Sequence, residues 1–154
     1  MKQSLQSILT THTGSLPRPN DLQQMLYAKE RGEQVDQVAF ETKVQEAVQA
    51  VVRRQAACGI DVVNDGEMSK ISYSTYVKDR LTGFEGTGRL KLGRSADLAD
   101  FPEYAQRMFA DISVIAGPAC TGPITYKGLA EVQRDIANLK AALQGVDVTS
   151  ASPL

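Results

Sequence analysis

The sequence predicts an α/β fold built on parallel strands, because helical patterns lead directly into strand patterns twice along the chain. A helix predicted over 36–57 ends at a Cys-Gly pair, and the apolar strand 60–64 follows at once. A second helix, predicted over 124–143, ends near Gly145, after which a strand begins at 146–149. Helices that alternate with strands in this way favour a parallel sheet with helical crossovers.

The first strand is expected over 7–11 and runs into a polar loop. Pro17 and Pro19 exclude a helix within that loop, because proline lacks a backbone donor. An Asn-Asp pair can then cap a short helix over 22–31, which Gly32 ends.

The long helix over 36–57 is expected to pack through one stripe of side chains. That stripe is predicted to consist of Val35, Val38, Thr42, Val48, Val51 and Val52. Between 82 and 118 the pattern is irregular and rich in glycine, which is unusual inside a compact domain unless the segment has a function. We therefore expect one domain over 1–154, with a long insertion after the second strand.

Composition excludes several classes of protein. The 154 residues are 42% apolar and 23% charged with a net charge of −1, which argues against a dedicated nucleic-acid or membrane-surface partner. No apolar run reaches the roughly 18 residues of a membrane helix, and the N-terminus has no signal-peptide pattern. Two cysteines, Cys58 and Cys120, are too few for a disulfide framework, so a cytoplasmic location is expected.

The loop after the first strand is a candidate binding site. His12, Thr13, Gly14 and Ser15 offer hydroxyls, an imidazole and backbone N–H groups, which suit a carboxylate. The alternative is a polar turn in which Gly14 serves only its backbone angles. His12, the sole histidine, binds a substrate carboxylate or shuttles a proton on one interpretation, and makes a local hydrogen bond on the other.

A second candidate, Asn64-Asp65-Gly66-Glu67, lies at the end of the strand over 60–64, with two carboxylates on either side of a glycine. Glu67 is suited to an ammonium group, and Asp65 is suited to orienting Arg18 or a nearby loop. With the loop over 12–15, Arg18, Asp65 and Glu67 are the predicted substrate-binding residues. The alternative is that Asp65 or Ser69 caps the next helix, as these residue types often do.

Other reactive side chains point to less specific roles. Cys120 has no second histidine to activate it as a nucleophile, so a packed small residue is expected there. A basic set is suited to an anionic substrate tail but is equally typical of a solvated loop; it comprises Arg89, Lys91 and Arg94, near Tyr104. The chain has no H-x-C or C-x-x-C pair, no dinucleotide or Walker loop and no G-x-S-x-G.

Three motifs in order resemble the catalytic domain of the cobalamin-independent methionine synthase family, in its shorter, single-barrel branch. They are TTHTGSLPRP over 10–19, GIDVVNDGEM over 59–68 and GPITYKG over 122–128. The resemblance implies the N-terminal part of a (β/α)₈ TIM barrel. It also implies a cytoplasmic zinc methyltransferase of methionine biosynthesis, which passes a methyl group from methyltetrahydrofolate to homocysteine.

The resemblance also implies roles for residues of this chain. The family's Gly-Ser loop, here Thr13, Gly14 and Ser15, contacts the amino-acid substrate, and its Gly-Glu pair, ending here at Glu67, binds the ammonium group. The family's zinc ligands, a His-x-Cys pair followed by a Glu and a further Cys, have no counterpart in this sequence. We therefore expect a fragment without catalytic zinc and without turnover.

Two alternatives stay open. The chain is either a non-catalytic half-barrel that assembles with a partner chain or with its own copy through an open sheet edge, or a family relative with altered thiol chemistry. Addition to an epoxide and decarboxylation are examples of such chemistry.

Overall fold

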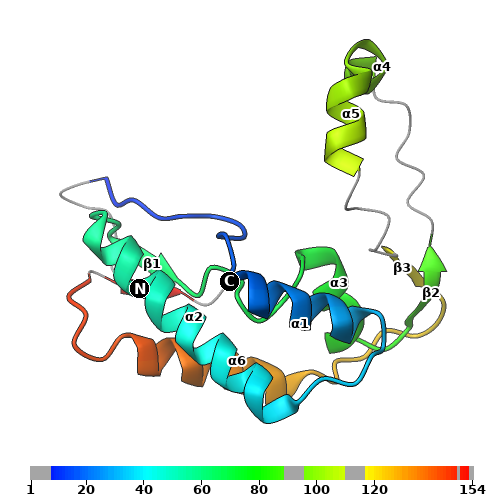
Figure 1. Ribbon diagram of the computed structural model, residues 1–154. Helices are drawn as coiled ribbons and strands as arrows, with labels where there is room; N and C mark the ends of the chain where they lie inside the picture. The colour runs from blue at the N-terminus through cyan, green and yellow to red at the C-terminus, as the bar shows by residue number, and fades with distance from the viewer. Residues whose placement is uncertain (1–7, 89–95, 110–116, 149, 153–154) are drawn as a thin grey trace. The chain divides into compact units, whose positions relative to one another are not determined.

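The computed structural model describes residues 8–88, 96–109, 117–148 and 150–152. They form two compact units, one of Met1–Ser72 with Gly128–Leu154 and the other of Tyr73–Lys127. Figure 1 traces both along the chain. Whether the two act as the single domain expected from the sequence stays a prediction.

The helices described in the first unit are α1 (Asn20–Glu30), α2 (Gln37–Ala57) and α6 (Leu129–Ala142). The side chain of Asp36 begins α2 by accepting hydrogen bonds from the backbone nitrogens of Val38 and Ala39. Such a cap satisfies donors that have no partner inside the helix. The predicted helices over 22–31 and 36–57 are thus both present, with ends within two residues.

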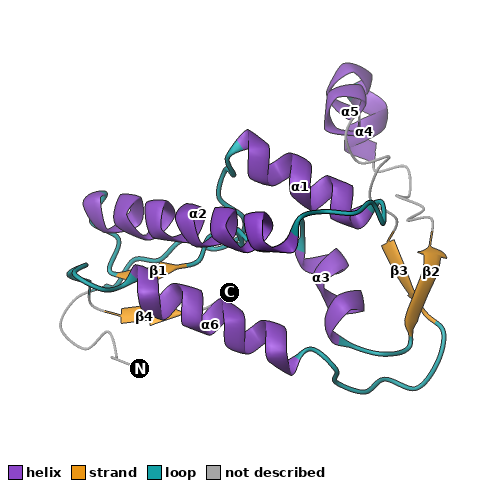
Figure 2. Ribbon diagram, turned by 60° about the horizontal axis from the view of Figure 1, so that its bottom comes forward, coloured by secondary structure: helices purple, strands orange, loops and turns teal. Residues whose placement is uncertain are grey.

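Parallel pairing holds the strands of this unit together, as the sequence predicts. Strand β1 (Val62–Asn64) pairs in parallel with β4 (Ser150–Ser152), and Thr11 makes a parallel bridge to Val62 from the other side. Figure 2 shows β1 and β4 side by side, with α2 running along β1.

Two predicted strand positions are wrong in detail. In the first predicted strand Thr11 makes a β-bridge to Val62, and the third strand begins at Ser150 rather than at 146. Val146 and Val148 lie between α6 and β4, outside any strand, and pack against the core instead. The alternating apolar residues that predicted a strand therefore contribute to the core here and not to strand pairing.

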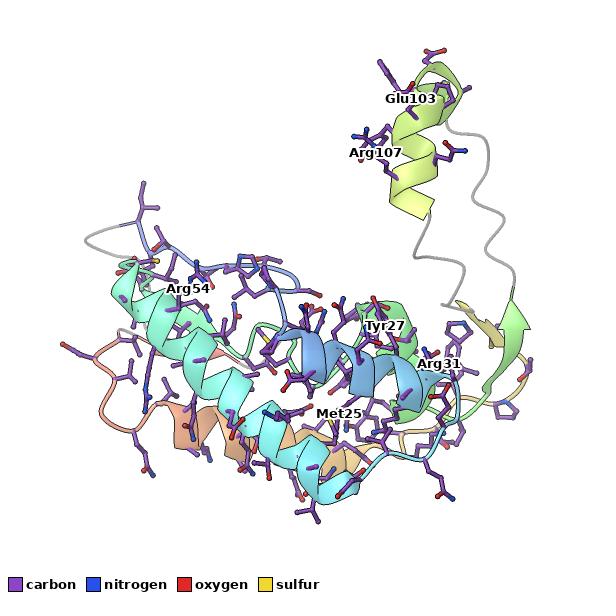
Figure 3. The ribbon with its side chains drawn as sticks, viewed as in Figure 1. Met25, Tyr27, Arg31, Arg54, Glu103 and Arg107 are labelled. Atoms are coloured by element: carbon purple, nitrogen blue, oxygen red, sulfur yellow. The ribbon has the colours of Figure 1, made fainter. Side chains whose placement is uncertain are left out.

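The core of the first unit lies between the helices and the strands. Its buried members are Leu22, Leu26, Phe40, Val44, Ala47, Val48, Val51, Val52, Val63, Met68, Leu139 and Ala142. In Figure 3, Met25 projects from α1 toward α2, and it packs against this core. The predicted stripe of α2 is partly wrong, because Val38 is 75% exposed and Thr42 is exposed, while Phe40 and Val44 are buried.

Helix α6 begins five residues later than the sequence predicts. The preceding backbone is already paired within the second unit: Thr82 N donates to Thr125 O at 2.9 Å, and Lys127 N donates to Arg80 O at 2.8 Å. A backbone committed to such an antiparallel contact cannot make helical hydrogen bonds at the same time.

The second unit contains α3 (Tyr73–Arg80), β2 (Phe84–Gly88), α4 (Ala96–Asp100), α5 (Pro102–Phe109) and β3 (Gly117–Cys120). Strands β2 and β3 pair antiparallel, with Phe84 opposite Cys120. Figure 3 shows Glu103 and Arg107 on α5. The segment over 82–118, predicted to be irregular, thus contains strand and helix among its described residues.

The described residues are a mixed α/β structure, and they do not close into a barrel. The α/β class is therefore confirmed. Among these residues no helix is both long and apolar enough to cross a membrane.

Candidate functional site

Parallel pairing brings the two candidate motifs together. Thr11 lies beside Val62, so the loop after Thr11 and the turn after β1 leave the sheet at the same edge. The backbone nitrogen of Leu16 donates to the carbonyl oxygen of Gly66 at 3.0 Å. Residues some 50 positions apart in the sequence thus form one cluster at the carboxyl ends of parallel strands, the usual place for ligands in such folds.

Ser15 and Glu67 are in direct contact. The hydroxyl of Ser15 donates to Oε2 of Glu67 at 2.5 Å, and the Glu67 residue is only 9% exposed. The other carboxylate oxygen, Oε1, has no partner among the described residues. A largely buried carboxylate with an unused acceptor is suited to a cationic ligand.

The loop offers donors to complement that carboxylate. Thr13, Gly14 and Ser15 donate no backbone hydrogen bond within the described part of the chain. Backbone N–H groups left free in a loop are available as donors to an anion. The loop therefore combines anion-binding donors with an adjacent acidic acceptor.

Arg18 binds the backbone of the acidic turn. Its Nη2 donates to Glu67 O at 2.9 Å and to Ile71 O at 3.3 Å, and its Nε donates to Glu67 O at 3.2 Å. Burial lowers the pKa of the Arg18 guanidinium, although the charge of Glu67 raises it in part. These contacts are those of a residue that holds the turn.

The acidic turn has an uncommon backbone. Gly66 has a φ of 62° and Glu67 a φ of 57°, so both adopt the left-handed conformation. For a residue other than glycine this costs about 1 to 2 kcal/mol. Such strain persists only where the surroundings hold it, and here Ser15 holds the Glu67 side chain while Arg18 holds its carbonyl group.

Asp65 supports the same turn. It is buried, and its Oδ1 accepts a hydrogen bond from Glu67 N at 3.0 Å. Burial raises the pKa of Asp65, against the opposing effects of that hydrogen bond and of the Lys70 ammonium. The contact stabilises the turn itself, whereas the alternative was that Asp65 or Ser69 caps the next helix, and that helix, α3, begins only at Tyr73.

His12 makes a local contact. Its Nε2 lies 3.0 Å from the carbonyl oxygen of Gly14, two residues along, and the side chain is half-buried. The interpretation of a local hydrogen bond is thus met, while a role toward a substrate stays a prediction.

Asn64 is a member of the cluster to which the sequence interpretation assigned no role of its own. It is 1% exposed; its Nδ2 donates to His12 O at 2.7 Å, and its Oδ1 accepts from Gly66 N at 2.9 Å. Its backbone is held by the buried side chain of Gln55, which accepts from Asn64 N and donates to Asn64 O. The only sequence signal was an amide at the end of an apolar strand.

The described residues do not fit a zinc site. They contain no group of three or more His, Cys, Asp or Glu side chains that could hold a metal ion. Cys58 and Cys120 are both exposed, so the prediction that Cys120 is packed is wrong: it ends β3, whose partner β2 pairs with its backbone and does not cover its side chain. The basic set of Arg89, Lys91 and Arg94 lies outside the described residues, and Tyr104 is exposed on α5.

The fold and the cluster define an α/β protein with a polar site at the ends of parallel strands. Residues 8–93 match the family described as the cobalamin-independent synthase catalytic domain, and the chain belongs to this family. That confirms the resemblance drawn from the three motifs.

Curated relatives cover more of the chain. A methionine synthase of Sulfolobus acidocaldarius is 34% identical over 60% of this chain and 27% of its own length. A 5-methyltetrahydropteroyltriglutamate–homocysteine methyltransferase of Thermotoga petrophila is 26% identical over 80% of this chain and 16% of its own. A methionine synthase of Thermococcus kodakarensis is 31% identical over 56% of this chain and 26% of its own. The chain thus spans about a quarter or less of these relatives.

Proposed function

We propose that this chain forms the amino-acid-binding part of an enzyme that transfers a methyl group to a thiol such as homocysteine. The observation that carries the proposal is the contact between Ser15 and Glu67, which joins the two motifs into one site. Relatives named as methionine synthases and as a homocysteine methyltransferase support the reaction class.

The chemistry of the cluster matches an α-amino acid. Glu67 would accept hydrogen bonds from the ammonium group at its unused Oε1, while the N–H groups of Thr13, Gly14 and Ser15 would donate to the carboxylate. Hydrogen bonds between charged groups of this kind are the strong ones. A ligand that carries both charges would therefore be held with its side chain directed away from both anchors.

The thiol chemistry would come from outside these residues. In the proposed enzyme, zinc lowers the pKa of the substrate thiol, and methyltetrahydrofolate is the methyl donor. The described residues supply no fitting zinc ligands. We propose that they belong to the N-terminal part of a (β/α)₈ barrel whose other part provides the metal, and that the isolated chain is inactive.

The open sheet suggests how that barrel is completed. In the described residues β4 pairs only with β1, and exposed strand edges tend to recruit another strand. The proposal thus includes assembly with a partner chain or with a second copy, in the cytoplasm. Sedimentation of the purified chain tests the second copy: a monomer at all concentrations would exclude it.

Isothermal titration with L-homocysteine and L-methionine tests amino-acid binding. The wild-type chain should bind both, and Glu67→Gln should weaken binding about tenfold or more, because a charged hydrogen bond is lost. Glu46→Gln, an exposed change on α2, is the matched control and should bind as the wild type does. Equal affinity of Glu67→Gln and wild type would reject the proposal.

The alternative function is that of a family relative with altered thiol chemistry, and it differs from the proposed one in which ligands it would bind. Thermal-shift measurements with a panel of thiols, with and without folates, would then show stabilisation by a thiol that lacks the amino-acid group.

A further inference from the structure

Asn64 joins the two halves of the proposed site through its side chain. One end of the amide donates to His12 O, in the loop that would bind a carboxylate, and the other end accepts from Gly66 N, next to Glu67. Both hydrogen bonds are shorter than 3.0 Å, and the side chain is almost fully buried. A single planar amide therefore links the loop to the acidic turn.

The backbone of Asn64, which carries this side-chain amide, is itself held in place. Gln55 on α2 accepts from Asn64 N at 3.1 Å and donates to Asn64 O at 2.8 Å, and the same Nε2 also lies 3.2 Å from Val51 O. Buried polar groups that are all satisfied hold one geometry, because leaving any one unpaired is costly. Helix α2 thus anchors the backbone of Asn64 through the side chain of Gln55.

We infer that Asn64 is a positioning residue for amino-acid recognition, which sets the distance between the donors of the loop and the carboxylate of Glu67. The inference rests on the proposed function. An aspartate at this position keeps an oxygen for Gly66 N but places a second acceptor against the carbonyl oxygen of His12. The loop would then move away from the turn, and a ligand could not reach both anchors at once.

The test compares L-methionine with 4-(methylthio)butanoate, which lacks the ammonium group. The ratio of the two dissociation constants reports the contact of Glu67 with that group. We expect a ratio of about ten or more in the wild type, from one charged hydrogen bond, and near one in Glu67→Gln. In Asn64→Asp the ratio of dissociation constants should fall to within about twofold of the ratio in Glu67→Gln. The control Asn138→Asp, on α6, should keep the wild-type ratio.

The ratio separates positioning from folding. A purely structural role would reduce the folded fraction and the binding stoichiometry but leave the ratio of the folded molecules unchanged. A wild-type ratio in Asn64→Asp would overturn the inference alone, while a ratio near one in the wild type would overturn the proposed function and the inference with it.

Asn64→Ser and a measurement on the wild type cover the case in which Asn64→Asp does not fold. The serine variant should likewise lose the ratio. In the wild type, L-methionine should slow hydrogen exchange of the Asn64 side-chain amide, as seen by NMR, more than 4-(methylthio)butanoate does. Equal exchange with the two ligands would contradict the inference.

Discussion

The guanidinium of Arg18 donates twice to the carbonyl oxygen of Glu67, at 2.9 Å from Nη2 and 3.2 Å from Nε. The residue with the candidate ligand-binding carboxylate is thus held at its main chain by one side chain, and at its carboxylate by Ser15. The pair explains how a glutamate keeps a left-handed backbone.

Replacing Arg18 should loosen the turn. Arg18→Met removes the hydrogen bonds of a charged donor to Glu67 O and Ile71 O, and Glu67 O keeps the 3.3 Å hydrogen bond from Lys70 N. Hydrogen bonds to a charged group contribute about 1.5 to 3 kcal/mol, so the free energy of unfolding should fall by about that amount. Arg18→Lys should recover little of the loss, because an ammonium cannot reproduce the planar fork. Urea denaturation measures the change.

Arg31→Met is the matched control for Arg18. Arg31 pairs with Glu33 on the surface, where an ion pair adds little, so its loss should leave the urea midpoint unchanged. Equal midpoints for the two methionine variants would show that Arg18 does not support the turn.

The left-handed backbone of Glu67 should invert the usual ranking of glycine and alanine. Glu67→Gly and Glu67→Ala both lose the carboxylate, but only glycine relieves the strain, so Glu67→Gly should be the more stable by about 1 kcal/mol. At Ala50, exposed within α2, the ranking should be normal, and Ala50→Gly should cost about 1 kcal/mol. Thermal unfolding of the three variants measures these differences in stability. If Glu67→Ala were more stable than Glu67→Gly, the left-handed conformation at position 67 would be contradicted.

The raised pKa of Asp65 predicts a particular pH dependence. Since burial raises the pKa in the folded state above 3.8, the folded chain holds this proton more tightly than the unfolded chain. The stability it contributes is therefore full below 3.8 and is lost as the pH rises through the folded pKa. Asp65→Asn keeps an acceptor for Glu67 N, so its stability relative to the wild type should rise as the pH increases above 3.8 and through the raised folded pKa of Asp65.

Asp61 should give a pH dependence of stability opposite in sign to that of Asp65. Hydrogen bonds from Thr10 N and Thr10 Oγ lower the pKa of Asp61, so its contribution is present above 3.8 and lost as the pH falls through the folded pKa. The advantage of the wild type over Asp61→Asn should shrink on acidification. Urea titrations across the pH range measure both differences, and a pH-independent difference for Asp65→Asn would refute the expected direction.

The sequence predicted what depends on local pattern and motif order. The parallel arrangement, the bounds of α2, the family and the meeting of the two motifs follow from spacing and from where strands end. The roles of Arg18 and Asn64 do not, because both act on backbone atoms of residues distant in the sequence. The late start of α6 was missed for the same reason, since its preceding backbone pairs with residues near Leu81.

Gly83 should be indispensable to the second unit. It has a φ of 76°, and a Cβ atom there would lie 2.5 Å from Gly122 O and 2.7 Å from Pro123 O. These are backbone atoms, which cannot rotate away, so Gly83→Ala must part the contact at which Thr121 N donates to Gly83 O. Overpacking of this kind costs about 1 to 3 kcal/mol, on top of the left-handed strain.

Gly122 offers a control on the opposite side of the same contact. A Cβ atom at Gly122 would meet nothing within 4 Å, so Gly122→Ala should leave the contact intact. Hydrogen exchange of the Thr82 and Thr121 amides, which donate to Thr125 O and Gly83 O, reports opening of this segment without global unfolding. We expect faster exchange of both amides in Gly83→Ala and wild-type rates in Gly122→Ala; equal rates in the two variants would mean that the close approach at Gly83 does not hold the segment together.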